Sequence, residues 1–250
     1  KLHWQIEKMR YSGEPGWVNG EAAEKRRPNM AGVNPCGEIL LDTHGVCNLT
    51  TINVYAFAKE GKLDEKGLYE AQRLSARAGY RMTCVELELP SWNYVQNRDR
   101  LLGCSLTGWQ DMVNAVGLDK AGEATILRKL REVAREAADE YAKSLGHNTP
   151  ILITTVKPEG TLSQLPAVSS GVHYSHSEYF IRRVRINSHD PLVKVCEELG
   201  YPVHPEVGQD LATCVTKVVD FPIKSPPGRT KYDVTAIGQL ENYTMFLAND

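Results

Sequence analysis

The stretch Gly32-Val33-Asn34-Pro35-Cys36-Gly37-Glu38-Ile39-Leu40-Leu41 has the most specific pattern in this chain, and Cys47-Asn48-Leu49 begins eleven residues after Cys36. Asn34-Pro35 favours a turn, and Gly37 permits backbone angles that other residues avoid. In extended backbone the side chains alternate between two sides, so Cys36 and Glu38 are expected to face the same way. The pattern predicts a tight loop that presents a thiol and a carboxylate together, anchored by the apolar residues that follow.

A second block, residues 157–165 with residues 168–173 after it, follows the apolar, β-branched run 151–156. We expect a buried strand at 151–156 and a possible helix after the block, because free backbone amides at a helix start bind phosphate. The amides of Glu159, Gly160, Thr161 and Leu162 and the hydroxyls of Thr161 and Ser163 are the candidate phosphate ligands. Glu159 has to point away, since its carboxylate repels phosphate. A plain turn between strand and helix explains the same residues equally well.

Composition excludes several classes of protein. The chain has 250 residues, 42% of them hydrophobic and 24% charged, as in a globular protein of one large or two small domains. A net charge of −2 gives no reason to expect nucleic acid or a membrane surface as a partner, and no apolar run is long enough to span a bilayer. The six cysteines form no C-x-x-C pair, so we expect no zinc site and a reducing, cytoplasmic setting. The missing initiator Met suggests a piece of a longer protein.

Hydrophobic periodicity predicts an α/β architecture. Residues 1–31 read as a polar lead-in with a possible helix near 20–25, and Pro90 to Asn93 as a break. The small, apolar segment 100–108 suits close packing against a sheet better than phosphate binding. Helices are expected at 64–83, 121–145, from Pro191 to Gly200 and at 237–248, and strands at 180–186 and 214–223. Arg182, Arg183 and Arg185 read as a solvated strand edge rather than as phosphate contacts.

The two blocks together resemble a known family. Asn34-Pro35-Cys36-Gly37-Glu38-Ile39 with the later Cys47-Asn48-Leu49 is similar to the finger loop of ribonucleotide reductases, and the spelling and short gap resemble the adenosylcobalamin-dependent (class II) branch. Lys157 to Leu165, followed by Val168 to His173, resembles that family's phosphate-binding loop, about 120 residues further on. The resemblance implies a ten-stranded α/β barrel with a central finger loop. Residues 1–250 would then be its C-terminal portion, with a lead-in at 1–31, the finger loop at 32–49 and the phosphate-binding loop at 157–173.

The same resemblance implies roles for four residues of the first block. Cys36 would hold a thiyl radical that removes the 3′-hydrogen of a ribonucleotide, and Glu38 would act as general base on the 3′-OH. Asn34 would bond the ribose hydroxyls. Cys47 would supply reducing equivalents with a second cysteine, which the family places upstream of Cys36 and which this sequence lacks. The residues alone also allow another interpretation, in which Cys36 is a buried structural cysteine in a turn and Cys47 is a small core residue. A catalytic dyad of Cys36 with His44 or His173 is not supported, because no protease signature accompanies these residues.

The resemblance also implies partners. They are adenosylcobalamin, a ribonucleotide, a thioredoxin-like reductant, and a deoxynucleotide effector on a segment outside this chain. Likeness to the monomeric sub-branch implies the triphosphate as substrate. Adenosylcobalamin brings its own cobalt, so no protein metal site is expected. The product would be 2′-deoxyribonucleotide for DNA synthesis. Two alternatives stay open at this point: a fragment of the diiron-dependent (class I) large subunit, and a non-catalytic remnant that only binds nucleotide.

Overall fold

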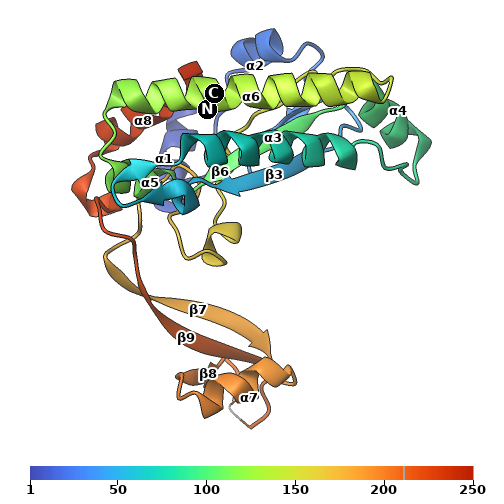
Figure 1. The fold of residues 1–250 in the computed structure, drawn as a ribbon. Helices are drawn as coiled ribbons and strands as arrows, with labels where there is room; N and C mark the ends of the chain where they lie inside the picture. Colours follow the sequence, from blue (N-terminus) through green and yellow to red (C-terminus); the bar gives the residue numbers. More distant parts are fainter. Residues whose placement is uncertain (211, 250) are drawn as a thin grey trace. The chain divides into compact units, whose positions relative to one another are not determined.

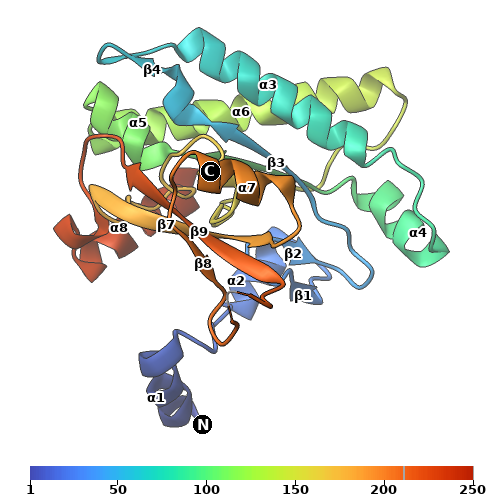
Figure 2. The same ribbon diagram turned by 90° about the horizontal axis from the view of Figure 1, so that it is seen from below.

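The computed structural model describes residues 1–210 and 212–249 (Figure 1). These residues divide into two compact units. Unit 1 contains residues 1–50, 72–104 and 131–155; unit 2 contains residues 51–71, 105–130 and 156–250. Two long helices and two strands run from one unit into the other. They are α3 (Glu65–Met82), α6 (Lys120–Ser144), β3 (Asn48–Asn53) and β6 (Leu102–Thr107). Strands β3 and β6 pair with each other, and α3 and α6 lie beside them in both views (Figure 2).

Unit 1 holds the first block of the sequence. Its other elements are α1 (Leu2–Ser12), α2 (Gly20–Arg26), β1 (Gly32–Val33), β2 (Leu40–Leu41) and α4 (Pro90–Asp99). Its core joins α3, α6 and β6 through small side chains. Four alanines of α6 are buried at spacings of three and four, which lets the helix approach Ala76 and Tyr80 of α3 closely: Ala134, Ala137, Ala138 and Ala142.

Unit 2 has a core of larger side chains. Trp109, at the start of α5 (Trp109–Val116), is fully buried; its ring packs edge to face on Phe246 of α8 (Ala236–Asn249) at 5.2 Å. Its indole nitrogen donates to Glu123 at 2.9 Å, and Lys120 pairs with the same carboxylate at 2.8 Å. The remaining short elements are η1 (Val54–Phe57), β4 (Ala58–Lys59), β5 (Lys62–Leu63), η2 (Leu162–Gln164) and η3 (Lys231–Asp233).

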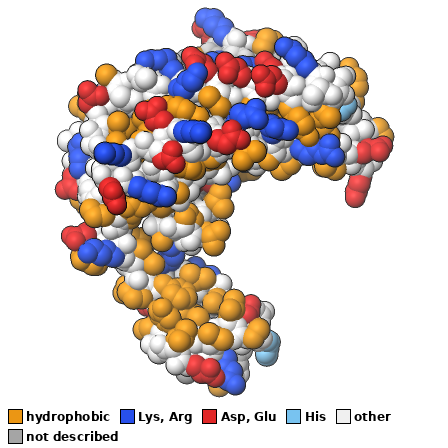
Figure 3. Space-filling view, viewed as in Figure 1, with side chains coloured by type: hydrophobic (Ala, Val, Ile, Leu, Met, Phe, Trp, Pro, Cys, Tyr) orange, Lys and Arg blue, Asp and Glu red, His pale blue; other side chains and the backbone are white. Residues whose placement is uncertain are grey.

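A three-stranded antiparallel sheet makes up the rest of unit 2. Strand β9 (Thr216–Lys224) lies between β7 (Tyr179–Asn187) and β8 (Val203–Pro205), and α7 (Pro191–Glu198) packs on all three. Along β7, half-buried and exposed residues alternate over nine positions, as expected when one face of a strand is covered. Apolar side chains gather over this part of the molecule (Figure 3).

Most of the expected helices and strands are confirmed. The structure has α3, α6, α7, α8, β7 and β9 close to the expected ranges; Asp190 caps α7 through the Leu192 amide, and segment 100–108 contains the wholly buried β6. The expected break at Pro90 is wrong: Pro90 is the first residue of α4, a position where a missing amide costs nothing. The lead-in also contains a regular helix, α1, none of whose residues is buried.

The expected strand at 151–156 is wrong as well. Only Thr154 forms a bridge, parallel to Cys104 of β6, although the amides of Leu102 and Cys104 both donate to this segment. Pairing stops because the Lys157 amide bonds the Ser105 side chain and Pro158 has no amide to donate.

Trp109→Phe is expected to lower the free energy of unfolding by about 2–4 kcal/mol, because it leaves a cavity and removes a donor from a buried carboxylate. Trp92→Phe, on the exposed side of α4, is the matched control and is expected to change stability by less than about 0.5 kcal/mol. Chemical denaturation measures both. Equal effects of the two substitutions would contradict this account of the core.

Candidate active site

The first block folds into a short hairpin in unit 1, here called the Cys36 hairpin (residues 32–41). Strands β1 and β2 pair antiparallel, with Val33 opposite Leu40. The Gly37 amide donates to the Asn34 carbonyl at 2.9 Å, which closes a turn with Pro35 at its second position, and Gly37 has a φ of 80°. The Asn34 side chain accepts the Ile39 amide at 2.9 Å. The Asn-Pro and Gly signals therefore specify this turn locally.

The backbone between Cys36 and Glu38 is a turn, so the expectation of extended backbone there is wrong. The tight turn at Gly37 separates the environments of the two side chains. Cys36 is exposed, whereas both carboxylate oxygens of Glu38 are enclosed and accept no hydrogen bond from any described residue. An enclosed carboxylate without a donor is costly, so this group is a strong acceptor for a hydroxyl placed beside it.

The Cys36 hairpin is anchored on β6 by a close approach at Gly103. A Cβ built on Gly103 would lie 2.5 Å from the end of Leu49 and 3.0 Å from that of Ile39. Thr155 adds a hydrogen bond, because its hydroxyl donates to the Glu38 carbonyl at 2.6 Å. Ile39 is buried in this contact, so the residue next to Glu38 is fixed in the core.

A buried ion pair holds the base of the hairpin, and no sequence pattern predicted it. Arg27, only 3% exposed, donates to the Leu40 carbonyl at 2.8 Å and to Asp99 at 2.6 Å. Arg98 also bonds Asp99 and continues to Asp42 at 2.7 Å. The hydrogen bond from Arg98 holds the pKa of Asp42 below its ordinary value. The lead-in before the hairpin is thus part of the structure that positions it.

Arg27→Ala should lower the free energy of unfolding by about 3–5 kcal/mol, because it leaves the buried Asp99 carboxylate with one of its two cations. Lys25→Ala on α2 is the control: Lys25 pairs with Glu21 on the surface, and its loss should cost no more than about 0.5 kcal/mol. Denaturant titration of both variants tests this. A cost for Arg27→Ala as small as that of Lys25→Ala would contradict the role assigned to Arg27.

Cys47 lies directly before β3 and is half-buried. The next residue, Asn48, donates from its side chain to the Leu101 carbonyl at 3.2 Å, which ties the start of β3 to the segment entering β6. Asn34, Cys36, Glu38 and Cys47 therefore all belong to unit 1, on a hairpin and strand start that share β6 as their support.

The second block lies in unit 2 and is here called the Glu159 loop (residues 157–165). The helix expected after it is a single 3-10 turn, Leu162–Gln164. Glu159 has a φ of 56° and is 2% exposed; one of its carboxylate oxygens accepts the Thr51 hydroxyl at 2.5 Å. The side chain therefore points inward, which removes the charge conflict that the sequence raised for an anion at this loop.

The Glu159 loop has three consecutive backbone amides without an acceptor among the described residues. Gly160, Thr161 and Leu162 are exposed, and within the described part of the chain no acceptor is bonded to their amides. Ser163, in contrast, is buried: its amide donates to the Glu159 carbonyl and its hydroxyl lies 3.0 Å from that of Ser170. Neighbouring backbone amides that lack an acceptor are donors that an anion can bind.

The Glu159 loop is supported by the segment that follows it. Gly171, with a φ of 53°, passes so close to the Lys157 carbonyl that a Cβ would lie 2.6 Å from it. Thr107 bonds both Ser169 and Gly171, and Asp111 accepts the Ser169 amide at 2.6 Å and the Ser175 hydroxyl at 3.3 Å. Burial raises the pKa of Asp111 above its ordinary value of 3.8. The sequence analysis missed this support, since one Asp in an amphipathic helix has no distinguishing pattern.

The raised pKa of Asp111 means that the folded state holds this proton more tightly than the unfolded state. Its contribution to stability is therefore complete below about pH 3.8 and is lost as pH rises through the folded pKa. Asp111→Asn keeps an acceptor for the Ser169 amide but removes the titration. We expect the stability of the variant relative to wild type to increase between about pH 3.8 and 6 in denaturation experiments. A constant difference across this range would contradict the assignment.

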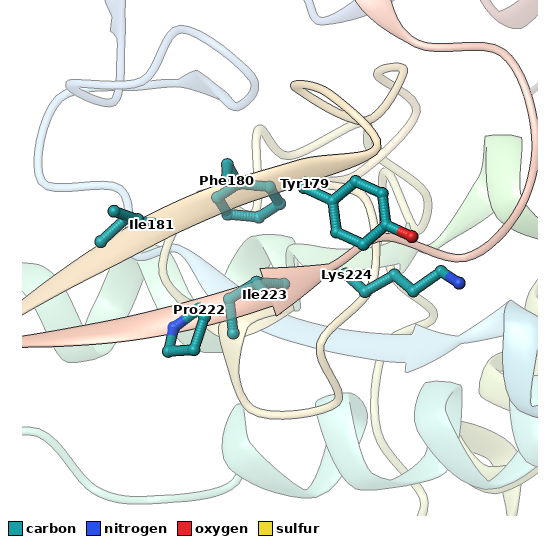
Figure 4. Close-up of a pocket in the computed structure, with 6 residues that line it drawn as sticks. All are labelled: Tyr179, Phe180, Ile181, Pro222, Ile223 and Lys224. Carbon is teal, nitrogen blue, oxygen red and sulfur yellow. The ribbon is translucent and has the colours of Figure 1, made fainter. Parts of the chain in front are cut away.

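The arginines of β7 lie on a solvated edge, as expected. Arg183 pairs with Asp220 at 3.3 Å and Arg185 with Glu206, while Arg182 donates to the Gln164 carbonyl. Beside them, Figure 4 shows a shallow apolar groove between β7 and β9, lined by Tyr179, Phe180, Ile181, Pro222, Ile223 and Lys224. Carboxylates thus compensate the charges of Arg183 and Arg185, whereas Arg182 bonds a carbonyl.

Residues 1–210 and 212–249 contain no group of three or more His, Cys, Asp or Glu arranged to hold a metal ion. In the same ranges, no helix has both the length and the apolar character needed to cross a bilayer.

Comparison with known proteins agrees with this geometry. Residues 4–146 match the family model described as "Ribonucleotide reductase, barrel domain". An adenosylcobalamin-dependent ribonucleoside-triphosphate reductase of Lactobacillus gasseri is 30% identical over 86% of this chain and 32% of its own length. A putative enzyme of the same name from Mycobacterium phage D29 is 33% identical over 85% of this chain and 32% of its own.

The crystal structure of a B12-dependent (class II) ribonucleotide reductase superposes with a TM-score of 0.84 at 26% identity, covering 98% of this chain and 38% of that one. The fold is therefore the α/β fold of a ribonucleotide reductase. The chain belongs to the ribonucleotide reductase family and matches the model of its barrel domain. It spans about a third of the length of the curated relatives that it matches.

Proposed function

We propose that this chain forms part of an adenosylcobalamin-dependent ribonucleoside-triphosphate reductase, which converts ribonucleotides to 2′-deoxyribonucleotides by thiyl-radical chemistry. The observation that chiefly supports the proposal is the pairing of an exposed thiol, Cys36, with the enclosed and unpartnered carboxylate of Glu38 on one hairpin. Relatives about 30% identical over most of this chain are named adenosylcobalamin-dependent ribonucleoside-triphosphate reductases, which supports the reaction and the triphosphate substrate.

In this proposal, Cys36 and Glu38 act on the same ribose carbon. The Cys36 sulfur, as a thiyl radical, takes the 3′-hydrogen, and Glu38 accepts the proton of the 3′-OH, so that the 2′-OH can leave as water. A carboxylate accepts a proton best when no other donor is bonded to its oxygens, and neither oxygen of Glu38 has such a donor among the described residues. Asn34 already accepts the Ile39 amide through its oxygen, so its side-chain NH₂ is the group we assign to the ribose hydroxyls.

Cys47 is the proposed reductant of the substrate radical. Together with a second thiol from outside this chain it would donate two electrons and two protons and become a disulfide. A thioredoxin-like dithiol would then reduce that disulfide. The deoxynucleotide effector would bind a segment outside these 250 residues, and residues 1–250 would be the C-terminal portion of a ten-stranded barrel, in the cytoplasm, with the Cys36 hairpin as its finger loop.

The Glu159 loop is the proposed site for the substrate phosphates. The exposed amides of Gly160, Thr161 and Leu162 would donate to phosphate oxygens, and the Thr161 hydroxyl would add a donor. Glu159 takes part through its backbone position alone, because its carboxylate is turned inward to Thr51. Ser163 contributes by holding the loop against Ser170.

Adenosylcobalamin fits the residues present in one respect. A thiol that an external radical source can reach is required, and Cys36 is exposed at the turn of its hairpin. When bound, the cofactor supplies the organic radical from which the thiyl radical derives. Cys36 is the residue of this chain that would face it, and the buried Ile39 beside Glu38 keeps that position fixed.

The test uses the intact protein with a ribonucleoside triphosphate, a dithiol reductant and adenosylcobalamin, measuring deoxynucleotide and released base. Cys36→Ser should abolish both products, because a serine O–H bond is too strong to replace the S–H bond. Cys47→Ser should still permit 3′-hydrogen abstraction and release free base instead of deoxynucleotide. Cys196→Ser, on α7, is the control and should retain turnover. Normal deoxynucleotide formation by either of the first two variants would overturn the assigned role.

A further inference from the structure

A thiol and an imidazole meet in unit 1 at a place that the proposed reaction does not use. Cys84 follows the end of α3 and His147 follows the end of α6, and the Cys84 sulfur lies 3.8 Å from Nδ1 of His147. The two residues are 63 positions apart in sequence, so the fold alone brings them together. Cys84 is half-buried and His147 is exposed, which leaves the pair accessible to small molecules.

The surroundings hold the two groups of the pair in place. Arg100, which is buried, donates to the carbonyl of Thr83, the residue before Cys84. The backbone carbonyl of Tyr80 accepts the Cys84 thiol at 3.6 Å, and the Tyr80 hydroxyl donates to the carbonyl of Asn148, the residue after His147. These bonds fix the segments that carry the sulfur and the imidazole, so the thiol stays within reach of Nδ1 of His147, which can take its proton.

We propose that Cys84 and His147 form a reactive thiol–imidazole pair, which makes Cys84 a site of reversible modification by small disulfides. Nδ1 of His147 takes the thiol proton, and the Cys84 thiolate attacks one sulfur of an external disulfide R–S–S–R. A bond forms between the Cys84 sulfur and S–R while the external S–S bond breaks. The second sulfur leaves as RS⁻ and takes up a proton from the imidazolium or from water, so that the electrons balance within the exchange.

The pH dependence of the reaction identifies the base. Besides the pair itself, the titratable and charged groups closest to it along the chain or packed on Tyr80 are Tyr80, Arg81, Glu86, Arg100, Tyr141 and Lys143. Tyrosine, arginine and lysine ionise well above pH 8 and glutamate below pH 5. A change of rate between pH 5 and 8 therefore reports the imidazole or the thiol of this pair.

The experiment measures the rate at which an aromatic disulfide labels each cysteine of the intact protein, with peptide mapping to separate the sites. His147→Gln should lower the rate at Cys84 at pH 7 by about 5–30-fold, because an isolated thiol is only a few per cent ionised there and a thiolate of lower basicity is a somewhat weaker nucleophile. The rate at Cys196 should not change. As pH falls below 8, the rate at Cys84 should decrease less steeply in wild type than in His147→Gln, where it should follow an ordinary thiol.

His189→Gln, another exposed histidine, is the matched control and should leave the rate at Cys84 unchanged. Circular dichroism and thermal unfolding of each variant separate a local effect from misfolding, and labelling at Cys104, which is buried, reports unfolding directly. If His147→Gln is folded and labels Cys84 at the wild-type rate, the proposal is overturned. It is likewise overturned if wild-type Cys84 reacts no faster than Cys196 at pH 7.

Discussion

The close approach of the Cys36 hairpin to β6 at Gly103 is the contact on which the candidate site in unit 1 depends. Ile39 and Leu49 occupy the space that any side chain at position 103 would take, so that the residue after Glu38 and the start of β3 rest on one strand. The Arg27–Asp99 pair fixes the base of the same hairpin through the Leu40 carbonyl. A rigid support of this kind is what a radical mechanism requires, because the reacting atoms must be held within a fraction of an ångström.

The surroundings of two carboxylates give them different roles, one in the proposed reaction and one in holding a loop. Glu38 is enclosed without a donor, so its acceptor capacity remains for a ligand. Glu159 is enclosed too, yet one of its oxygens is bonded by Thr51, and its inward direction leaves the backbone amides of its loop exposed. In the proposed function the first carboxylate is a base. The second shapes a loop, and its charge is kept away from the phosphates that the loop would bind.

The elements that the sequence predicted well are those whose forces are local. The 3.6-residue periodicity of α3 and α6, the Asp190 cap of α7 and the alternation along β7 each act over a few neighbouring residues. The predictions failed where a distant partner decided the outcome. Residues 151–156 pair with β6 only at Thr154. The error at Pro90 has a local cause instead, because a proline at the first position of a helix needs no amide. The candidate residues Asn34, Cys36 and Glu38 were found from one contiguous pattern, whereas Arg27 and Asp111 had no such pattern.

The sequence by itself therefore determined the turn at Asn34 to Gly37, the principal helices and strands, and the family resemblance of the two blocks. Only the tertiary structure decided that Cys36 is exposed while the Glu38 carboxylate is enclosed, and that Glu159 points toward Thr51. It also decided that Arg27 meets Asp99 and that Cys84 meets His147. The physical reason is that these contacts join side chains 63 to 108 residues apart in sequence. A local sequence pattern cannot predict which distant side chains will come together.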